Sequence, residues 1–485
     1  MTGAFFQPTK IRTVAWLFFY TALFWGVVFS MQWHYGFDPA DEGLLWYVAQ
    51  RTAKGEMPID DGLLQLRIAN TVFGLIGFLA VMIAIRHAHI PWPIALIAGL
   101  ALCVMMCFPR HKIYEQSLVL ILCATGYLVL SSVSRNRWLV LGITTGIAAL
   151  IGRNSGIYFL GASLALGITC WARTQPKTRP NLKSILLWAC GILIGYAPLL
   201  YMAIVNSPFR DAFFESVRAV GSWQARLPIM WPWRVTWSGS LNTYQHQLQM
   251  LSIFCLSLPI LARSVASLAG SSAIAGLAYL HHAFDSADFA HASQAGVAAI
   301  ISIAAICAYL ISHGNRASYI GGMIIGTFFF LLDFALWLPF GPMMAYRLSP
   351  SSYTSLEIHR SKFLVPNSFN LMVNQANEAL SQCVKRDGQI WVAPYGPGLY
   401  SFLGLRAPFW ELYYSYPRLE KMQEAHIEAM HKMHTGIALF NREQTIDERP
   451  ELRLARTYPL LMSSIESSCR KVAGESGTLE TWIRA

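Results

Sequence analysis

The sequence predicts an α-helical protein that crosses a membrane many times and carries a small α/β domain at its C-terminal end. Hydrophobic residues make up 54% of the 485 residues and charged residues only 13%, whereas soluble domains carry about 25% charged residues. The mean hydropathy of +0.40 requires many apolar stretches in a chain of this length. A helix of about 20 apolar residues spans the hydrocarbon. The sequence predicts about eleven spans, near residues 13–31, 67–86, 92–108, 117–133, 138–152, 156–171, 184–204, 248–262, 265–280, 293–311 and 318–338.

The basic residues of the short loops predict the orientation of these spans. Lys10 and Arg12 precede the first span, and further basic residues fall in alternate loops: Arg135, Arg137, Arg173, Lys177, Arg179, Lys183, Arg263 and Arg316. Because Lys and Arg gather in cytoplasmic loops, the N-terminus is expected in the cytoplasm. The loops 32–66, 109–116, 205–247 and 281–292 then face the outside. The apolar run 14–30 is long for a signal-peptide core and shows no obvious cleavage site, so it is expected to be a retained span.

The last 145 residues differ in kind from the rest. Residues 1–340 are expected to form the membrane domain and residues 341–485 an extracytoplasmic α/β domain, which is periplasmic if the membrane is a bacterial inner membrane. Helical spacing is predicted over 369–384, 419–434 and 458–472, and strands over 389–393 and 436–440. Among nine cysteines, only Cys383 and Cys469 lie in this polar region, where an oxidising compartment would allow a disulfide.

The formal net charge of +11 has a simple explanation in this topology. In a soluble protein such a charge would suggest nucleic acid binding. Here the basic residues mark the cytoplasmic loops, so we expect no nucleic acid partner.

An acidic loop directly follows the first predicted span. Asp38, Asp41 and Glu42 lie within five positions. Crowded carboxylates repel one another, which raises the pKa of at least one, and a general base works best when its pKa is near the operating pH. The alternative is a capped interfacial helix, because carboxylates are ordinary residues at a helix N-terminus.

The motif Asp41-Glu42-Gly43 in a first external loop, with the later stretch 55–60, resembles the GT-C superfamily of membrane glycosyltransferases. Within that superfamily it is most similar to the bacterial protein O-mannosyltransferase and aminoarabinose transferase group. The resemblance implies a multi-span fold with the catalytic acid in the first external loop, so that Asp41 would be the base and Glu42 its catalytic neighbour. Asp38 has no family counterpart and is expected to support them.

Two cationic sites on the predicted external face are candidates for holding a phosphate. Arg110, His111 and Lys112 form a cluster that opposes the usual charge bias, and Lys and Arg form charge-assisted bonds to phosphate. Snorkelling towards the membrane surface is the alternative. Arg153 lies in a Gly-flanked turn before Gly156-Ile157-Tyr158, and the resemblance implies a contact with the donor phosphate.

The external turn 281–292 is rich in titratable groups. Asp288 and His291 are three residues apart and can share one helical face, which suggests a hydrogen-bonded turn that supports the site. A divalent metal is an alternative for these histidines and acids, but no metal or other cofactor is favoured.

These observations predict a glycosyltransferase that uses a polyprenyl-phosphate-linked sugar. The resemblance implies transfer to a lipid, glycan or protein acceptor on the extracytoplasmic face, with inversion at the sugar carbon. The sequence contains no Gly-rich nucleotide loop, in agreement with a lipid-linked donor held among membrane lipids. A transporter of a lipid-linked or polar substrate and a non-catalytic envelope-assembly protein are the alternatives.

Overall fold

The structure is a computed structural model that describes residues 8–53, 62–132, 134–174, 179–221, 241–257, 264–285, 289–313, 316–358, 361–382, 390–409, 411–414, 417–432, 436–444, 450–474 and 479–484. It contains two compact units. The membrane unit comprises Met1–Ser30, Asn70–Glu215 and Ile229–Met344, and the α/β unit comprises Met31–Ala69, Ser216–Pro228 and Ala345–Ala485. The segment that follows the first helix is thus grouped with the C-terminal region rather than with the helices.

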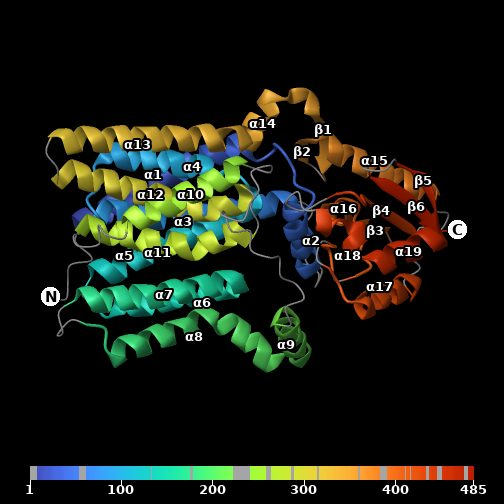
Figure 1. Cartoon of the computed structure of the whole chain (residues 1–485), viewed down its shortest axis with the longest axis horizontal. Coiled ribbons are helices and arrows are strands. Elements are labelled where there is room, and N and C mark those ends of the chain that lie inside the picture. The colour runs from blue at the N-terminus through green and yellow to red at the C-terminus, as the bar shows by residue number, and fades with distance from the viewer. Residues whose placement is uncertain are drawn as a thin grey trace. The chain divides into compact units, whose positions relative to one another are not determined.

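The membrane unit is a bundle of helices that lie side by side (Figure 1). Each of the eleven predicted spans overlaps a helix of the described residues: α1 (Pro8–Gln32), α3 (Gly62–His87), α4 (Trp92–Met106), α5 (Ile113–Ser131), α6 (Asn136–Ile151), α7 (Arg153–Arg173), α8 (Leu182–Val205), α10 (Leu241–Ser257), α11 (Ser264–Asp285), α12 (Phe289–His313) and α13 (Arg316–Trp337). A short 3-10 helix, η1 (Arg110–Lys112), precedes α5, and α9 (Ser207–Gly221) follows α8.

Five helical segments of the described chain are long and apolar enough to cross a membrane: Leu63–His87, Arg110–Ser131, Arg153–Arg173, Leu182–Val205 and Ala290–Ser312. Shorter apolar helices cover Trp92–Met106, Asn136–Ile151 and Ile320–Leu332. The structure therefore has the polytopic α-helical architecture that the hydropathy of the sequence predicts.

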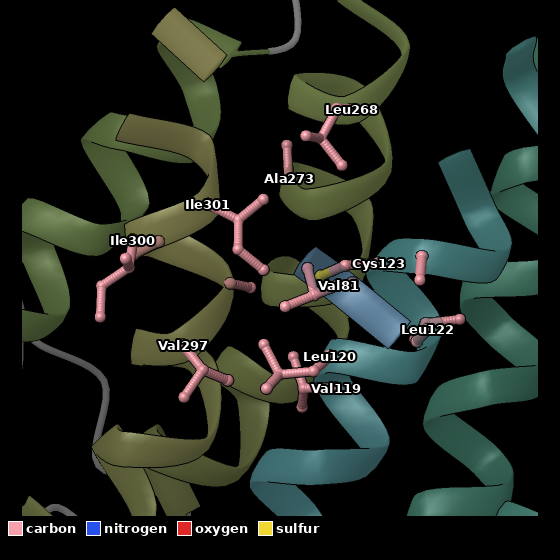
Figure 2. Packing of buried hydrophobic residues seen from close by; sticks show 14 of the residues in the cluster. Val81, Val119, Leu120, Leu122, Cys123, Leu268, Ala273, Val297, Ile300 and Ile301 are labelled. Carbon is pink, nitrogen blue, oxygen red and sulfur yellow. The ribbon is translucent and has the colours of Figure 1, made fainter. Parts of the chain in front are cut away.

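The core of the membrane unit lies between α3, α5, α11 and α12. Figure 2 shows Val81 from α3, Leu120 and Cys123 from α5, Leu268 from α11 and Ile301 from α12 within this cluster, all of them buried. Ser271 of α11 donates to the carbonyl oxygen of Cys123 in α5 at 2.9 Å, so this hydroxyl links the two helices. The apolar and small side chains let these helices pack closely.

Glycines bring α6 and α8 into backbone contact. A Cβ atom on Gly146 of α6 would collide with the carbonyl oxygen of Ile192, and one on Gly195 of α8 would collide with the carbonyl oxygen of Ile143. Small residues permit this close approach in a bilayer, where helix association depends on van der Waals packing.

The α/β unit contains a four-stranded sheet with the strand order β3-β4-β6-β5. Strands β3 (Ile390–Ala393) and β4 (Ile437–Phe440) are parallel, whereas β6 (Glu480–Arg484) runs antiparallel to both β4 and β5 (Cys469–Ala473). The connection from β3 to β4 contains α16 (Pro397–Phe402) and α17 (Glu420–Lys432). A separate hairpin of β1 (Tyr353–Ile358) and β2 (Ser361–Pro366) precedes α15 (Asn367–Gln382).

Helices cover both faces of this sheet. The side chains of β3 and β4 are buried throughout, because alternate residues enter two separate cores. Val392 and Leu439 pack in one core with Trp46 of α2 (Asp41–Ala53), whereas Trp391 and Phe440 pack in the other, against α18 (Leu454–Thr457) and α19 (Pro459–Ser468). Helix α2 is therefore part of the core of the α/β unit.

The tail elements predicted from the sequence are largely present. Helices α15 and α17 and strands β3 and β4 lie where they were expected. The helix expected over 458–472 is wrong in its last part, because α19 ends at Ser468 and the chain continues as the edge strand β5. Cys469 carries a free thiol, and Cys383 of the predicted disulfide lies outside the described residues.

The backbone contact between α6 and α8 predicts a sharp difference between two glycine substitutions. Gly195→Ala should destabilise the protein by about 1–3 kcal/mol, because the new methyl group has no space. Gly161→Ala on α7 is the matched control, since no atom lies within 4 Å of a Cβ there, and it should leave the unfolding temperature unchanged or slightly higher. Thermal unfolding in detergent measures both, and equal temperatures for the two variants would contradict the packing described.

Candidate active site

The acidic loop, residues 33–43, is attached to strand β2 through its backbone. The N–H of Leu364 donates to the carbonyl oxygen of His34 at 2.8 Å, and the N–H of Gly36 donates to the carbonyl oxygen of Leu364 at 2.7 Å. Gly36 has φ of +66°, a left-handed conformation that glycine adopts without strain. The turn at Gly36 then directs the chain away from β2 towards Asp38 and α2.

A buried ion pair fixes the other side of the acidic loop. Arg67 of α3 holds both carboxylate oxygens of Glu42, with Nε to Oε1 at 2.7 Å and Nη2 to Oε2 at 3.0 Å. The same guanidinium donates to the carbonyl oxygens of Trp33 and of Gly36, the latter at 2.7 Å. Both side chains are almost fully buried, at 1% and 3% exposed. A planar fork with several donors suits this task, which an ammonium group would not perform.

This geometry changes the expected role of Glu42. The sequence predicted Glu42 as a catalytic neighbour of Asp41, but both of its oxygens are engaged by Arg67. A carboxylate held in this way is a poor proton acceptor. We therefore propose that Glu42 positions the loop and does not transfer protons.

Gly43, the third residue of the Asp-Glu-Gly motif, packs directly against the backbone of Gly398. A Cβ atom on Gly43 would lie 2.6 Å from the Cα atom and the nitrogen of Gly398 in α16. The N–H of Gly398 also donates to the carbonyl oxygen of Pro39 at 2.9 Å. The turn-rich segment 393–400 of the C-terminal region thus lies directly against the acidic loop, and Gly43 makes this contact possible.

The two aspartates of the loop have different partners. The carboxylate of Asp38 accepts the backbone N–H groups of Ala40 at 2.9 Å and of Asp41 at 3.2 Å, as a capping residue before α2 does. Asp41, the first residue of α2, accepts a hydrogen bond from the hydroxyl of Tyr413 at 2.6 Å. A distance this short is typical of an O–H group that donates to an ionised carboxylate.

The surroundings of the acidic loop raise the pKa of two groups, that of Asp38 and that of Tyr413. Burial, together with the neighbouring charge of Asp41, raises the pKa of Asp38 to about 7. Burial and the adjacent Asp41 also raise the pKa of Tyr413, which keeps this hydroxyl protonated and able to donate. The rise in the pKa of Asp38 thus comes first from burial and second from the crowding of carboxylates that the sequence predicted.

The predicted phosphate-binding residues all belong to the membrane unit. Arg110, His111 and Lys112 form η1, and Lys112 lies 3.7 Å from Glu115 in the first turn of α5. Arg153 is the first residue of α7. These cations therefore lie at helix starts, as the turns in the sequence predicted. Their joint action with the acidic loop stays a prediction.

A group of tyrosine and histidine rings lies at the start of α7, the end of α11 and the start of α12. His291 of α12 lies 4.6 Å from His282 of α11, measured between ring centroids. Tyr158, one turn after Arg153, lies 6.2 Å from His282 and 4.9 Å from Tyr279. His291 thus lies beside the imidazole ring of His282, which in turn lies near the ring of Tyr158. Asp288, its predicted partner, lies outside the described residues.

Two residues of the acidic site, Arg67 and Tyr413, were not predicted from the sequence. Gly398 belongs to the turn-rich segment 393–400, for which the sequence left two alternatives, a position facing the active cavity or a cap of the domain. Arg67 had a signal, because a lone cation within an apolar run requires a buried partner. Tyr413 had none, since its partner Asp41 is 372 residues away.

Comparison with known proteins supports the fold. No family model and no curated protein sequence matches the chain. The structure is similar to the crystal structure of ArnT from Cupriavidus metallidurans bound to undecaprenyl phosphate, with a TM-score of 0.51 and 12% sequence identity, over 97% of this chain and 98% of that chain. At this level of identity the likeness is one of fold.

The buried pair of Arg67 and Glu42 predicts a large effect on stability. Arg67→Met leaves Glu42 without its partner and should cost about 3–5 kcal/mol. Lys432→Met, which removes the exposed partner of Glu428, is the control and should cost less than about 1 kcal/mol. Thermal unfolding of the full chain measures both, and a loss for Arg67→Met no greater than the control would contradict the assignment.

The raised pKa of Asp38 predicts a pH-dependent stability. The folded state binds this proton more tightly than the unfolded chain does, so the stabilisation is complete at low pH and is lost as the pH rises through about 7. The unfolding temperature of the wild type should fall between about pH 4 and about pH 7, and that of Asp38→Asn should fall less. Parallel pH profiles for the two proteins would show that Asp38 titrates normally.

Proposed function

We propose that the protein is a glycosyltransferase that moves a sugar from a polyprenyl-phosphate donor to an acceptor on the extracytoplasmic face of a bacterial inner membrane. The observation that carries the proposal is the fixed arrangement of Asp38 and Asp41 at the start of α2, in a chain whose fold is similar to that of ArnT bound to undecaprenyl phosphate. A lipid-linked donor also explains why such a site belongs to a polytopic membrane protein.

Asp41 is the residue we assign as the base. Asp41 is only partly buried, and its Oδ1 accepts the hydrogen bond of the Tyr413 hydroxyl. Burial of Glu42 against Arg67 holds the adjacent backbone rigid, so the acid has a defined position. Preorganised groups of this kind reduce the cost of reaching the transition state.

The proposed reaction is a direct displacement at the anomeric carbon of the sugar. The acceptor hydroxyl oxygen bonds to the anomeric carbon, its proton passes to Asp41, and the bond from the anomeric carbon to the phosphate oxygen breaks. The electron pair of that bond leaves with the polyprenyl phosphate, so the configuration at carbon is inverted. The protonated Asp38 limits the negative charge beside Asp41 below a pH of about 7.

Cations of the membrane unit are proposed to hold the leaving phosphate. Arg153 and Lys112, with Arg110 and His111, offer charge-assisted hydrogen bonds to its oxygens. An apolar cavity of about 300 Å³ between α10, α12 and α13 is lined by side chains that include Ile253, Ile303 and Phe329. Such a cavity suits part of a prenyl chain.

We propose that this transfer needs no resident metal, because Asp41 and the cations already supply a base and a phosphate clamp. Carboxylate oxygens are also ligands for hard divalent cations. Assays of transfer with and without a chelator therefore test this part of the proposal.

Removal of the base should abolish transfer. Asp41→Asn should lower the rate of sugar transfer from a panel of polyprenyl-phosphate sugars by about 10²–10⁴-fold, the usual contribution of a general base. Asp211→Asn is the matched control, because the Asp211 side chain of α9 is 74% exposed, and its rate should equal that of the wild type. Full transfer by purified Asp41→Asn would refute the assigned base.

The rival functions make different predictions in the same preparation. A transporter would move substrate across liposomes without forming a glycosidic bond, and an assembly protein would do neither. Absence of transfer from every donor in the panel by the wild type would refute the glycosyltransferase itself.

A further inference from the structure

A second apolar cavity lies in the membrane unit, and none of the residues assigned to catalysis lines it. It has a volume of about 550 Å³ and is lined by residues of α6, α7 and α8 and by Pro180 just before α8. Its walls include three indole rings, those of Trp138, Trp171 and Trp188. This volume falls within the range of small-molecule sites, about 300–1,000 Å³.

The cavity lies at the opposite end of α7 from the proposed phosphate site. Trp171 is 18 residues after Arg153 in the same helix, which corresponds to about 27 Å along its axis. The remaining walls come from the second half of α7, from Trp138 near the start of α6, and from Pro180 and the first turns of α8. A ligand here is therefore separate from the donor of the proposed reaction.

One basic side chain, that of Arg179, contacts a wall residue of the cavity, and a second, Lys183, is next in sequence to the wall residue Ser184. The guanidinium of Arg179 lies 4.3 Å from the centroid of the Trp171 ring, and its Nε donates to the carbonyl oxygen of Thr174 at 3.4 Å. These two contacts hold a cation beside a wall of the cavity. Lys183 is exposed in the first turn of α8, whose N-terminus also carries partial positive charge.

The apolar lining of the cavity and the basic residues beside it together favour an anionic lipid as the ligand. The walls are almost wholly apolar and contain few polar groups for a sugar or a nucleotide. Tryptophan rings at such a site suit the boundary between acyl chains and headgroups. Arg179 and Lys183 supply the charges that attract the phosphate of an anionic lipid.

We propose that this cavity binds an anionic phospholipid, with an acyl chain between α6, α7 and α8 and the phosphate at Arg179 and Lys183. The lipid belongs to the leaflet at the basic end of the bundle. It would hold α7 and α8 together at an end where the side chains of α8 are largely exposed. This binding goes beyond the proposed transfer reaction and does not depend on it.

Phosphatidylglycerol and phosphatidylcholine are the probes, added to the full-length protein in detergent. Native mass spectrometry counts bound lipid, and thermal unfolding reports its effect. Wild-type protein should bind one phosphatidylglycerol at least tenfold more tightly than phosphatidylcholine and should unfold at a higher temperature in its presence.

Three variants assign that binding to the cavity. Gly167→Phe places a ring in the cavity, where a Cβ atom would meet only Trp138 at 3.9 Å, and it should abolish tight binding. Gly161→Phe lies on the same helix with no atom within 4 Å of a Cβ, and it should bind as the wild type does. Arg179→Gln keeps the cavity open and should weaken phosphatidylglycerol about tenfold without affecting phosphatidylcholine.

Several outcomes would overturn the proposal. Equal affinity of the wild type for the two lipids would indicate ordinary annular lipid. Unchanged phosphatidylglycerol binding by Gly167→Phe would place the lipid elsewhere. Displacement of phosphatidylglycerol by undecaprenyl phosphate, with tighter binding of the latter, would assign the cavity to the prenyl lipid instead. Because each readout is binding or stability, failure of sugar transfer would leave these results unaffected.

Discussion

The hydrogen bonds of a single guanidinium, that of Arg67, organise the acidic end of the α/β unit. Arg67 forms a buried pair with Glu42 and also binds two backbone carbonyl groups of the same loop. A buried ion pair contributes little net stability compared with apolar side chains, but loss of one partner is costly. Its value here is geometric, because it holds Asp38 and Asp41 at the start of α2 in one arrangement.

The C-terminal region contributes packing and a hydrogen bond to the acidic loop and α2. Trp46 of α2 is buried in the same core as strands β3 and β4, and Gly43 packs on Gly398. Tyr413 then supplies a hydrogen bond to Asp41. The position of the proposed base thus depends on the folding of residues more than 350 positions later in the chain.

The membrane unit has two chemically different ends. Histidines, tyrosines and cations lie together at the starts of α7 and α12, where ring contacts join Tyr158, His282 and His291. The other end of α7 has tryptophans around an apolar cavity with Arg179 at its rim. The first end holds the residues proposed to bind the donor phosphate, and the second holds the cavity proposed to bind an anionic lipid.

Local patterns were enough to predict the helices, the polar tail and the acidic loop. Hydropathy and charge act over one or two helical turns, so eleven apolar segments, the basic loops and the crowding of Asp38, Asp41 and Glu42 can all be read from the chain. The roles of these acids could not be read in the same way. Only the fold paired Glu42 with Arg67, placed Gly398 against Gly43 and brought Tyr413 to Asp41. These contacts join distant segments through packing and hydrogen bonds, for which no short stretch of sequence carries a periodic signal.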